Sequence, residues 1–197
     1  MTMRPAVAIL AAALCAACSS APKTSAPVPS VSASTQDALD PLAAPCSAVS
    51  PESAEDGPPL TGDRAVPGLT AARLPEGLSF GRPFGDLPAL DPTQAATLNV
   101  AGYTWSNGLD ATSSAFREVV VGLVCGVRDE TQLRGLVAGA KPTTFRGLPA
   151  VTWTSHSHGD GPFIMWLARP DRALFVGVSP TYRQQFPRIA AGVTLTP

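Results

Sequence analysis

The sequence contains little that would attract nucleic acid or an anionic membrane surface. Lys23 and Lys141 are its only lysines, and its 14 basic residues face 15 acidic ones. A nucleic-acid-binding surface needs a local basic excess, and electrostatic attachment to lipids needs a polybasic segment. The composition therefore argues against both classes of protein, and we expect no nucleic-acid partner.

Long apolar runs are also absent. The run from Pro5 to Leu14 follows the basic residue Arg4 and is too short to span a bilayer as a permanent helix. The small residues Ala16 and Ala17 then lead to a cysteine. A basic residue, a short apolar run and a small-residue end are typical of a secretory signal. The sequence thus predicts an exported protein.

The end of this signal resembles the lipobox of bacterial lipoproteins, in which a peptidase cuts before a diacylglycerol-modified cysteine. Cys18 is the predicted lipidation site, although Cys15 stands three residues before it, where Leu is usual. Cys15 is the other candidate, but Leu14 would then stand where the pattern has a small residue. The resemblance implies that residues 1–17 are removed and that acylated Cys18 anchors the chain in membrane lipid, at the extracytoplasmic face of the cell membrane. Two acyl chains suffice for stable attachment. The alternatives are an ordinary cleaved signal that releases a soluble protein, and a retained membrane helix.

Cysteine is scarce beyond the signal. Cys46 and Cys125 are the only two that remain. In an oxidising compartment such a pair predicts a disulfide, which would stabilise the fold by roughly 4 kcal/mol on the chain-entropy model. The alternative is a pair of buried, reduced cysteines.

Aromatic residues are missing from the chain before Phe80. We therefore expect the main core to be built from the residues downstream. Residues 18–37 are rich in Ser, Pro and Ala and are predicted to form a flexible tether. Residues 38–97 are predicted to be a Pro-rich irregular region packed on the domain. Residues 64–90 within it are predicted to be short edge segments or loops, because central strands tolerate Pro poorly. Residues 98–197 are the predicted core domain.

Strand and helix patterns become clear within this core domain. Residues 98–107 read as a strand, and residues 117–127 as the strongest strand, apolar on both faces and therefore central. A short amphipathic helix is predicted over residues 129–140, beginning at a capping box formed by Asp129 and Gln132.

The second half of the core domain reads as strands followed by a helix. Residues 143–155 contain two extended pieces around Gly147, and residues 163–168 and 173–179 form a hairpin whose Pro170-Asp171 centre suits a type I turn. An apolar stripe from Tyr182 to Val193 predicts a second helix. The order predicts an α+β fold, in which an antiparallel sheet is packed by about two helices.

Three stretches resemble a known family. They are residues 146–151 (Arg-Gly-Leu-Pro-Ala-Val), the hairpin at residues 163–178, and residues 186–193. Together they are similar to the mature domains of small actinobacterial lipoproteins that have a PsbP-like α/β/α sandwich. The resemblance implies that fold, but the family has no uniform activity and so implies no reaction.

Histidine occurs only at positions 156 and 158, in a loop that also contains Asp160. His-x-His-x-Asp resembles the ligand spacing of metallo-β-lactamase-type hydrolases, and His156, His158 and Asp160 could hold Zn²⁺. However, Gly161 stands where that family has its next histidine. The interpretation we favour is a polar hairpin loop turned by residues 159–161, with no metal, no cofactor and no catalytic residue.

Tryptophan is the last scarce residue type that could form a site. Trp105, Trp153 and Trp166 could line a ligand groove, but among only twelve aromatic residues they are expected in the core.

The leading hypothesis is a non-catalytic binding or scaffold module with an envelope protein partner. The alternatives are a carrier or sensor of a small apolar or glycan ligand, and a metal-dependent hydrolase.

Overall fold

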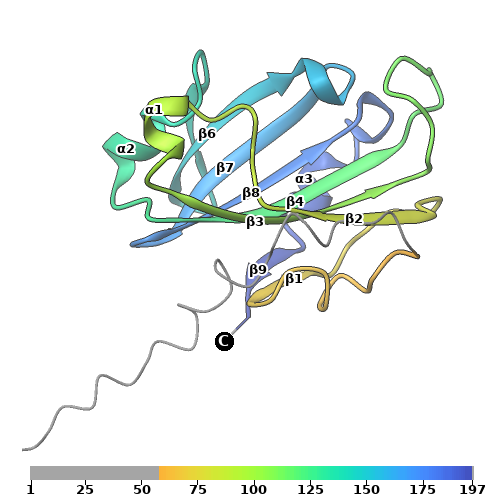
Figure 1. Cartoon of the computed structure of the whole chain (residues 1–197), viewed down its shortest axis with the longest axis horizontal. Helices are drawn as coiled ribbons and strands as arrows, with labels where there is room; N and C mark the ends of the chain where they lie inside the picture. Colours follow the sequence, from red (N-terminus) through yellow and green to blue (C-terminus); the bar gives the residue numbers. More distant parts are fainter. Residues whose placement is uncertain (1–57, 197) are drawn as a thin grey trace, which may run out of the picture. The chain divides into compact units, whose positions relative to one another are not determined.

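The computed structural model describes residues 58–196 (Figure 1). Three predicted features lie outside these residues: the signal with Cys18, the tether at residues 18–37, and Cys46. No helix in the described part of the chain is both long enough and apolar enough to cross a bilayer.

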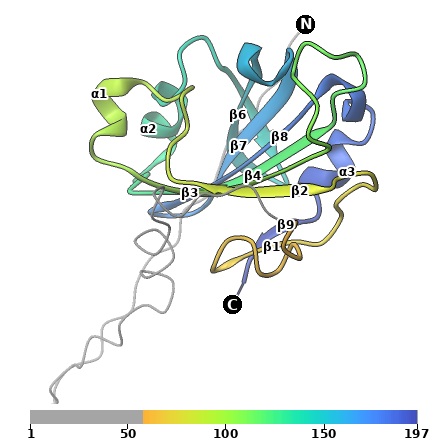
Figure 2. The same ribbon diagram turned by 45° about the vertical axis from the view of Figure 1, so that its right-hand side comes forward.

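A seven-stranded antiparallel sheet forms the centre of the described residues (Figures 1 and 2). Its strands lie in the order β2-β3-β4-β8-β7-β6-β5, and a two-stranded sheet pairs β1 with β9. The predicted antiparallel sheet is confirmed, but the helices of the described residues are short, so the fold is mostly β. The strands are β1 (Leu69–Ala71), β2 (Phe80–Phe84), β3 (Asn99–Ser106), β4 (Glu118–Cys125), β5 (Lys141–Phe145), β6 (Leu148–Ser155), β7 (Gly161–Arg169), β8 (Arg172–Val178) and β9 (Val193–Leu195). The helical segments are α1 (Pro92–Ala95), α2 (Glu130–Gly135), η2 (His156–His158), η3 (Pro180–Tyr182) and α3 (Phe186–Ala190).

Strand β4 is the central strand that the sequence predicted. All eight of its residues are buried, and it pairs with β3 on one side and β8 on the other. Alternate side chains enter two separate cores. Val119 and Val121 belong to the first core, and Val120 and Val124 to the second.

The two cores lie on opposite faces of the sheet and are closed by different elements. The first is covered by β1, β9 and α3, which contribute Leu69, Val193 and Ile189. The second is covered by α2, with Leu133, and by the chain around α1, with Leu90. Figure 2 shows α1 and α2 on one side of the sheet and β1 and β9 on the other.

Part of the predicted irregular region is regular. Residues 58–97 contribute β1, β2 and α1. Strand β2 contains Pro83 and lies at the edge of the sheet, where a residue without an N–H is tolerated. The predicted edge segments are thereby confirmed.

The helix predicted over Tyr182 to Val193 is wrong in extent. Tyr182 ends the 3₁₀ turn η3, the α-helix covers only Phe186–Ala190, and Val193 begins β9. Proline fits only the first turn of a helix, so Pro187 sets the start. Val193 pairs with Ala71, which is distant in the sequence. This pairing makes the end of the apolar stripe a strand and not part of the helix.

Two local details also differ from prediction. The turn at Pro170-Asp171 has a φ of 70° at Asp171, which a type I turn does not allow at that position. Helix α2 ends at Gly135, earlier than predicted, although Asp129 caps it by accepting a hydrogen bond from the Gln132 N–H at 2.8 Å. The Gln132 side chain completes the cap one residue further out, accepting from the Arg128 N–H at 2.8 Å.

Candidate functional site

The two histidines lie in the loop between β6 and β7, as the hairpin interpretation predicted, but they have different partners. His156 is exposed and hydrogen-bonds to Asp160 across the turn. His158 points the other way, and its Nδ1 lies 2.5 Å from Oε2 of Glu118. Within residues 58–196 no group of three metal-ligating side chains converges. The structure thus brings His158 to Glu118 and does not gather the proposed zinc ligands.

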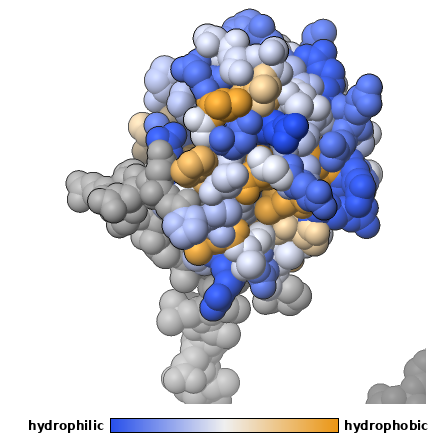
Figure 3. Space-filling model, turned by 90° about the vertical axis from the view of Figure 1, so that its right-hand side faces the viewer, coloured by the Kyte–Doolittle hydropathy of each residue, from blue (hydrophilic) through white to orange (hydrophobic). Residues whose placement is uncertain are grey.

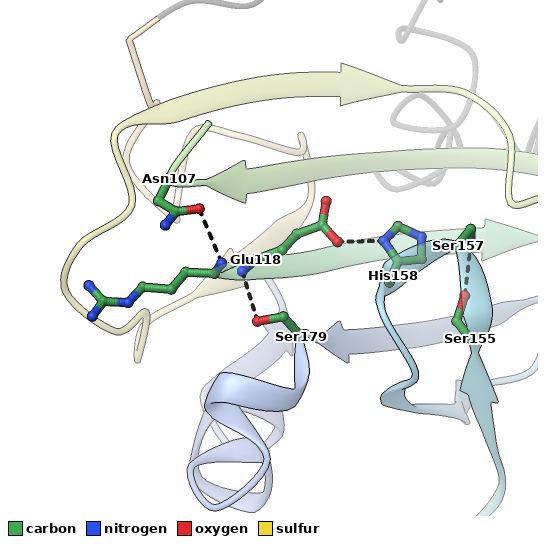
Figure 4. A network of polar contacts seen from close by, with 7 residues as sticks. Asn107, Glu118, Ser155, Ser157, His158 and Ser179 are labelled. Carbon is green, nitrogen blue, oxygen red and sulfur yellow. Dashed lines mark hydrogen bonds and ion pairs between the residues drawn. The ribbon is translucent and has the colours of Figure 1, made fainter. Parts of the chain in front are cut away.

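Glu118 is the site residue that sequence reasoning missed. It is the first residue of β4 and only 9% exposed. Two hydrogen bonds fix its backbone to Ser179, the residue after β8. Its N–H donates to Ser179 Oγ at 3.1 Å (Figure 4). Its carbonyl accepts from the Ser179 N–H at 3.0 Å. An acidic residue at the start of the strand predicted to be central was the available signal.

A second contact holds the imidazole of His158. Its ring packs against the ring of Phe163, with centroids 5.1 Å apart. Phe163 in turn lies over Gly177, its direct partner on β8, where a Cβ would come within 2.1 Å of the phenyl ring. Glycine at position 177 therefore leaves room for the Phe163 ring, against which His158 packs. A residue of the second core thus helps to position the histidine.

An open groove surrounds the Glu118–His158 pair, over the face of β2, β3 and β4. It consists of two adjoining hollows of about 220 and 240 Å³, which share Arg82 and Thr104. Phe80 and Leu109 at its rim are 47% and 46% exposed. We call this the β2–β4 groove; the further residues that line it are Ser106, Phe116 and Glu118 in the first hollow, and Phe84, Asp86, Leu87, Pro88 and His158 in the second. Figure 3 views the end of the molecule at the right of Figure 1 and shows its hydrophobic surface broken up by hydrophilic residues.

A Gly-x-Ser-x-Gly pattern lies next to this groove, at residues 77–81. In serine hydrolases the serine stands on a sharp turn from a strand into a helix. Here the pattern runs into the edge strand β2, and the Ser79 N–H donates to the carbonyl of Ser106 at 2.8 Å. Among the described residues, no hydrogen bond joins the Ser79 hydroxyl to a histidine. The local geometry is therefore not that of a nucleophile elbow.

The remaining predicted residues fall in different places. Trp105 and Trp166 are 1% and 2% exposed and belong to the first core. Trp153 is only partly buried and lines a surface hollow of about 520 Å³ together with Lys141 and Phe186.

Cys125 lies in β4 and is disulfide-bonded. Its partner is outside the described residues, so the predicted pairing with Cys46 stays a prediction.

Comparison with known proteins finds no matching family model, no matching curated protein and no matching solved structure.

Proposed function

We propose that this chain is a lipid-anchored extracytoplasmic protein that binds a protein partner of the cell envelope through the β2–β4 groove, without catalysing a reaction. Residues 1–17 act as the signal, Cys18 carries the acyl chains, and residues 18–37 act as the tether. The similarity to small actinobacterial lipoproteins with a PsbP-like fold belongs to the same proposal. The observation that carries it is the pair formed by buried Glu118 and partly buried His158 in an open groove.

The polar pair and its surroundings support recognition of a partner. Backbone hydrogen bonds to Ser179 and ring packing on Phe163 hold Glu118 and His158 in place before any partner arrives. Exposed apolar side chains at the rim, Phe80 and Leu109, offer surface that binding would bury. A partner could bury these apolar side chains and form a hydrogen bond to the fixed polar pair.

The division of the β2–β4 groove into two small hollows suits the side chains of a protein partner. Sites for drug-sized ligands enclose roughly 300–1,000 Å³. Each half of the β2–β4 groove is smaller, at about 220 and 240 Å³. One or two side chains protruding from a partner would fill such a space.

A non-catalytic role is supported by the surroundings of His158. A histidine–carboxylate pair acts in acyl transfer when the second ring nitrogen activates a nucleophile. In the described residues the contacts of His158 are to Glu118 and Phe163, and no serine hydroxyl is hydrogen-bonded to its Nε2.

The test is site-specific photo-crosslinking in the intact envelope. A photoreactive residue is placed at Phe80 or at Leu109 of the full chain, and at Leu60 as the matched control. Leu60 is equally exposed, at 49%, but its backbone hydrogen-bonds to Tyr103 and Trp105, whose side chains lie on the opposite face of the sheet.

We expect the photoreactive residue at Phe80 or Leu109 to give one discrete protein adduct of the same mass. The residue at Leu60 should give no adduct of that mass. The adduct from the groove positions should be lost when Glu118→Gln is added. An adduct that also forms from Leu60, or one that Glu118→Gln leaves unchanged, would contradict the proposal.

A carrier of a small apolar or glycan ligand is the second candidate function. The hollow beside Trp153, at about 520 Å³, has the size of a small-molecule site. Native mass spectrometry of the full chain purified from its own envelope tests this candidate. An added ligand mass that Trp153→Ala abolishes would support it, and a bare mass for the unchanged chain would reject it.

A further inference from the structure

A hollow on the opposite face of the sheet from the β2–β4 groove is lined by three arginines. It encloses about 530 Å³ and is formed by the segment before β2, by the residue before β4, and by η3 and α3. Arg73, Arg117 and Arg188 line it, each from a different segment. Among the described residues these three guanidinium groups form no ion pair and no hydrogen bond, and Glu76 is the only carboxylate in the lining. The hollow therefore carries an excess of two positive charges in a chain that is nearly neutral overall.

Hydrogen bonds connect the segments that present these arginines. The hydroxyl of Tyr182 donates to the carbonyl of Glu76 at 2.7 Å, which joins η3 to the segment that carries Arg73. The hydroxyl of Thr181 donates to the carbonyl of Phe116 at 2.7 Å, which joins η3 to the residue next to Arg117. The arginines are thus presented by a fixed framework.

Arg117 has a closer support of its own. Its Nη1 lies 2.6 Å from the position that a Cβ of Gly77 would occupy, so the guanidinium packs against the bare backbone of that glycine. Gly77 also has a φ of 85°, which disfavours any residue with a side chain. The backbone at position 77 thereby leaves room for the guanidinium.

We propose that this hollow binds a phosphate monoester of a small organic molecule. A phosphate monoester carries close to two negative charges at neutral pH, which matches the charge excess. Guanidinium groups bind phosphate oxygens in bidentate fashion. A volume of about 530 Å³ is within the range of small-molecule sites, so it also accommodates an organic body, with Gln185 and Thr181 as neutral hydrogen-bonding groups. This site is separate from the β2–β4 groove and does not depend on the partner proposed there.

The experiment is isothermal titration calorimetry on the purified full chain at constant ionic strength. The ligands are inorganic phosphate, glycerol phosphate and dihexanoyl phosphatidic acid, with acetate as the singly charged control. We expect glycerol phosphate to bind more tightly than inorganic phosphate, and acetate not to bind. Arg117→Gln and Arg188→Gln should each weaken binding by about tenfold, the loss of one charge-assisted hydrogen bond.

The matched control is Arg134→Gln, which removes an exposed arginine of α2 that pairs with Glu130. Its affinity for glycerol phosphate should equal that of the unchanged chain. The proposal is overturned if none of the phosphates gives saturable heat, if Arg134→Gln weakens binding as much as Arg117→Gln, or if both hollow variants bind normally. Tighter binding of phosphatidic acid than of glycerol phosphate would overturn the small-molecule assignment and identify a lipid headgroup as the source of the phosphate.

Discussion

Burial separates the two histidine–carboxylate pairs of the β6–β7 loop. The side chains of His156 and Asp160 are 91% and 66% exposed, whereas those of His158 and Glu118 are 22% and 12% exposed. Exposed pairs contribute about 0–1 kcal/mol because water competes for both groups. A buried acceptor that loses its partner costs about 1–3 kcal/mol, because water cannot replace the lost hydrogen bond.

Two matched alanine substitutions test this difference. His158→Ala should lower the free energy of unfolding by about 1–3 kcal/mol, since it leaves the Glu118 carboxylate without its partner. His156→Ala should change it by less than about 0.5 kcal/mol. Urea denaturation at neutral pH measures both values. Equal effects of the two substitutions would show that the buried pair is no more stabilising than the exposed one.

Two exposed aspartates should make the free energy of unfolding depend on pH under acidic conditions. The hydroxyl and then the backbone N–H of Thr93 lower the pKa of Asp91, and the backbone N–H and then the hydroxyl of Thr112 lower the pKa of Asp110, both from 3.8. A carboxyl whose pKa is lower in the folded state stabilises the fold above its unfolded pKa, and this contribution is lost as the pH falls through the folded pKa. We therefore expect stability to fall below pH 3.8, and to fall less steeply in the double variant Asp91→Asn, Asp110→Asn. Urea midpoints measured on both sides of pH 3.8 check this, and parallel curves for the two proteins would refute it.

Helix α2 depends on its N-terminal cap. Its six residues are too few to form a stable helix in isolation, so packing of Leu133 and capping by Asp129 must hold it. Asp129→Ala should lower the free energy of unfolding by about 1 kcal/mol, because the Gln132 N–H loses its acceptor. Asp129→Asn retains an acceptor at the same position and should lower the free energy of unfolding much less. Thermal unfolding of the two variants compares them, and equal losses would mean that the cap is not the cause.

Elements encoded by local patterns were predictable, and those decided by distant partners were not. Strand β4 is a continuous apolar run, and the β7–β8 hairpin consists of two apolar runs joined by Pro170-Asp171. Strand β9 has no such local pattern, because Val193 joins it by pairing with Ala71.

The same distinction holds at the site. The β6–β7 loop was predictable from its glycines, whereas the approach of Glu118 to His158 depends on β8 and β7 standing in that order beside β4.

At the scale of the whole molecule, the disulfide at Cys125 should be a major contribution to stability. Cys125 lies in the central strand, and a bond that closes a long loop restricts the unfolded chain most. Reduction should lower the melting temperature, and Cys46→Ala should lower it by the same amount without reductant, if the pairing with Cys46 is correct. The check is differential scanning calorimetry with and without reductant. An unchanged melting temperature in Cys46→Ala would assign the partner to another cysteine.

The pairing of β1 with β9 also determines when folding can finish. Leu69 lies opposite Leu195, so the two-stranded sheet joins an early strand to the last one. Contacts between residues so far apart in the chain form late, because the entropy of closing the intervening loop must be overcome first. The first core thus stays open on one side until residues 193–195 are available to pair with β1. For a chain exported as proposed, we expect this late pairing to help keep the polypeptide unfolded until it has crossed the membrane.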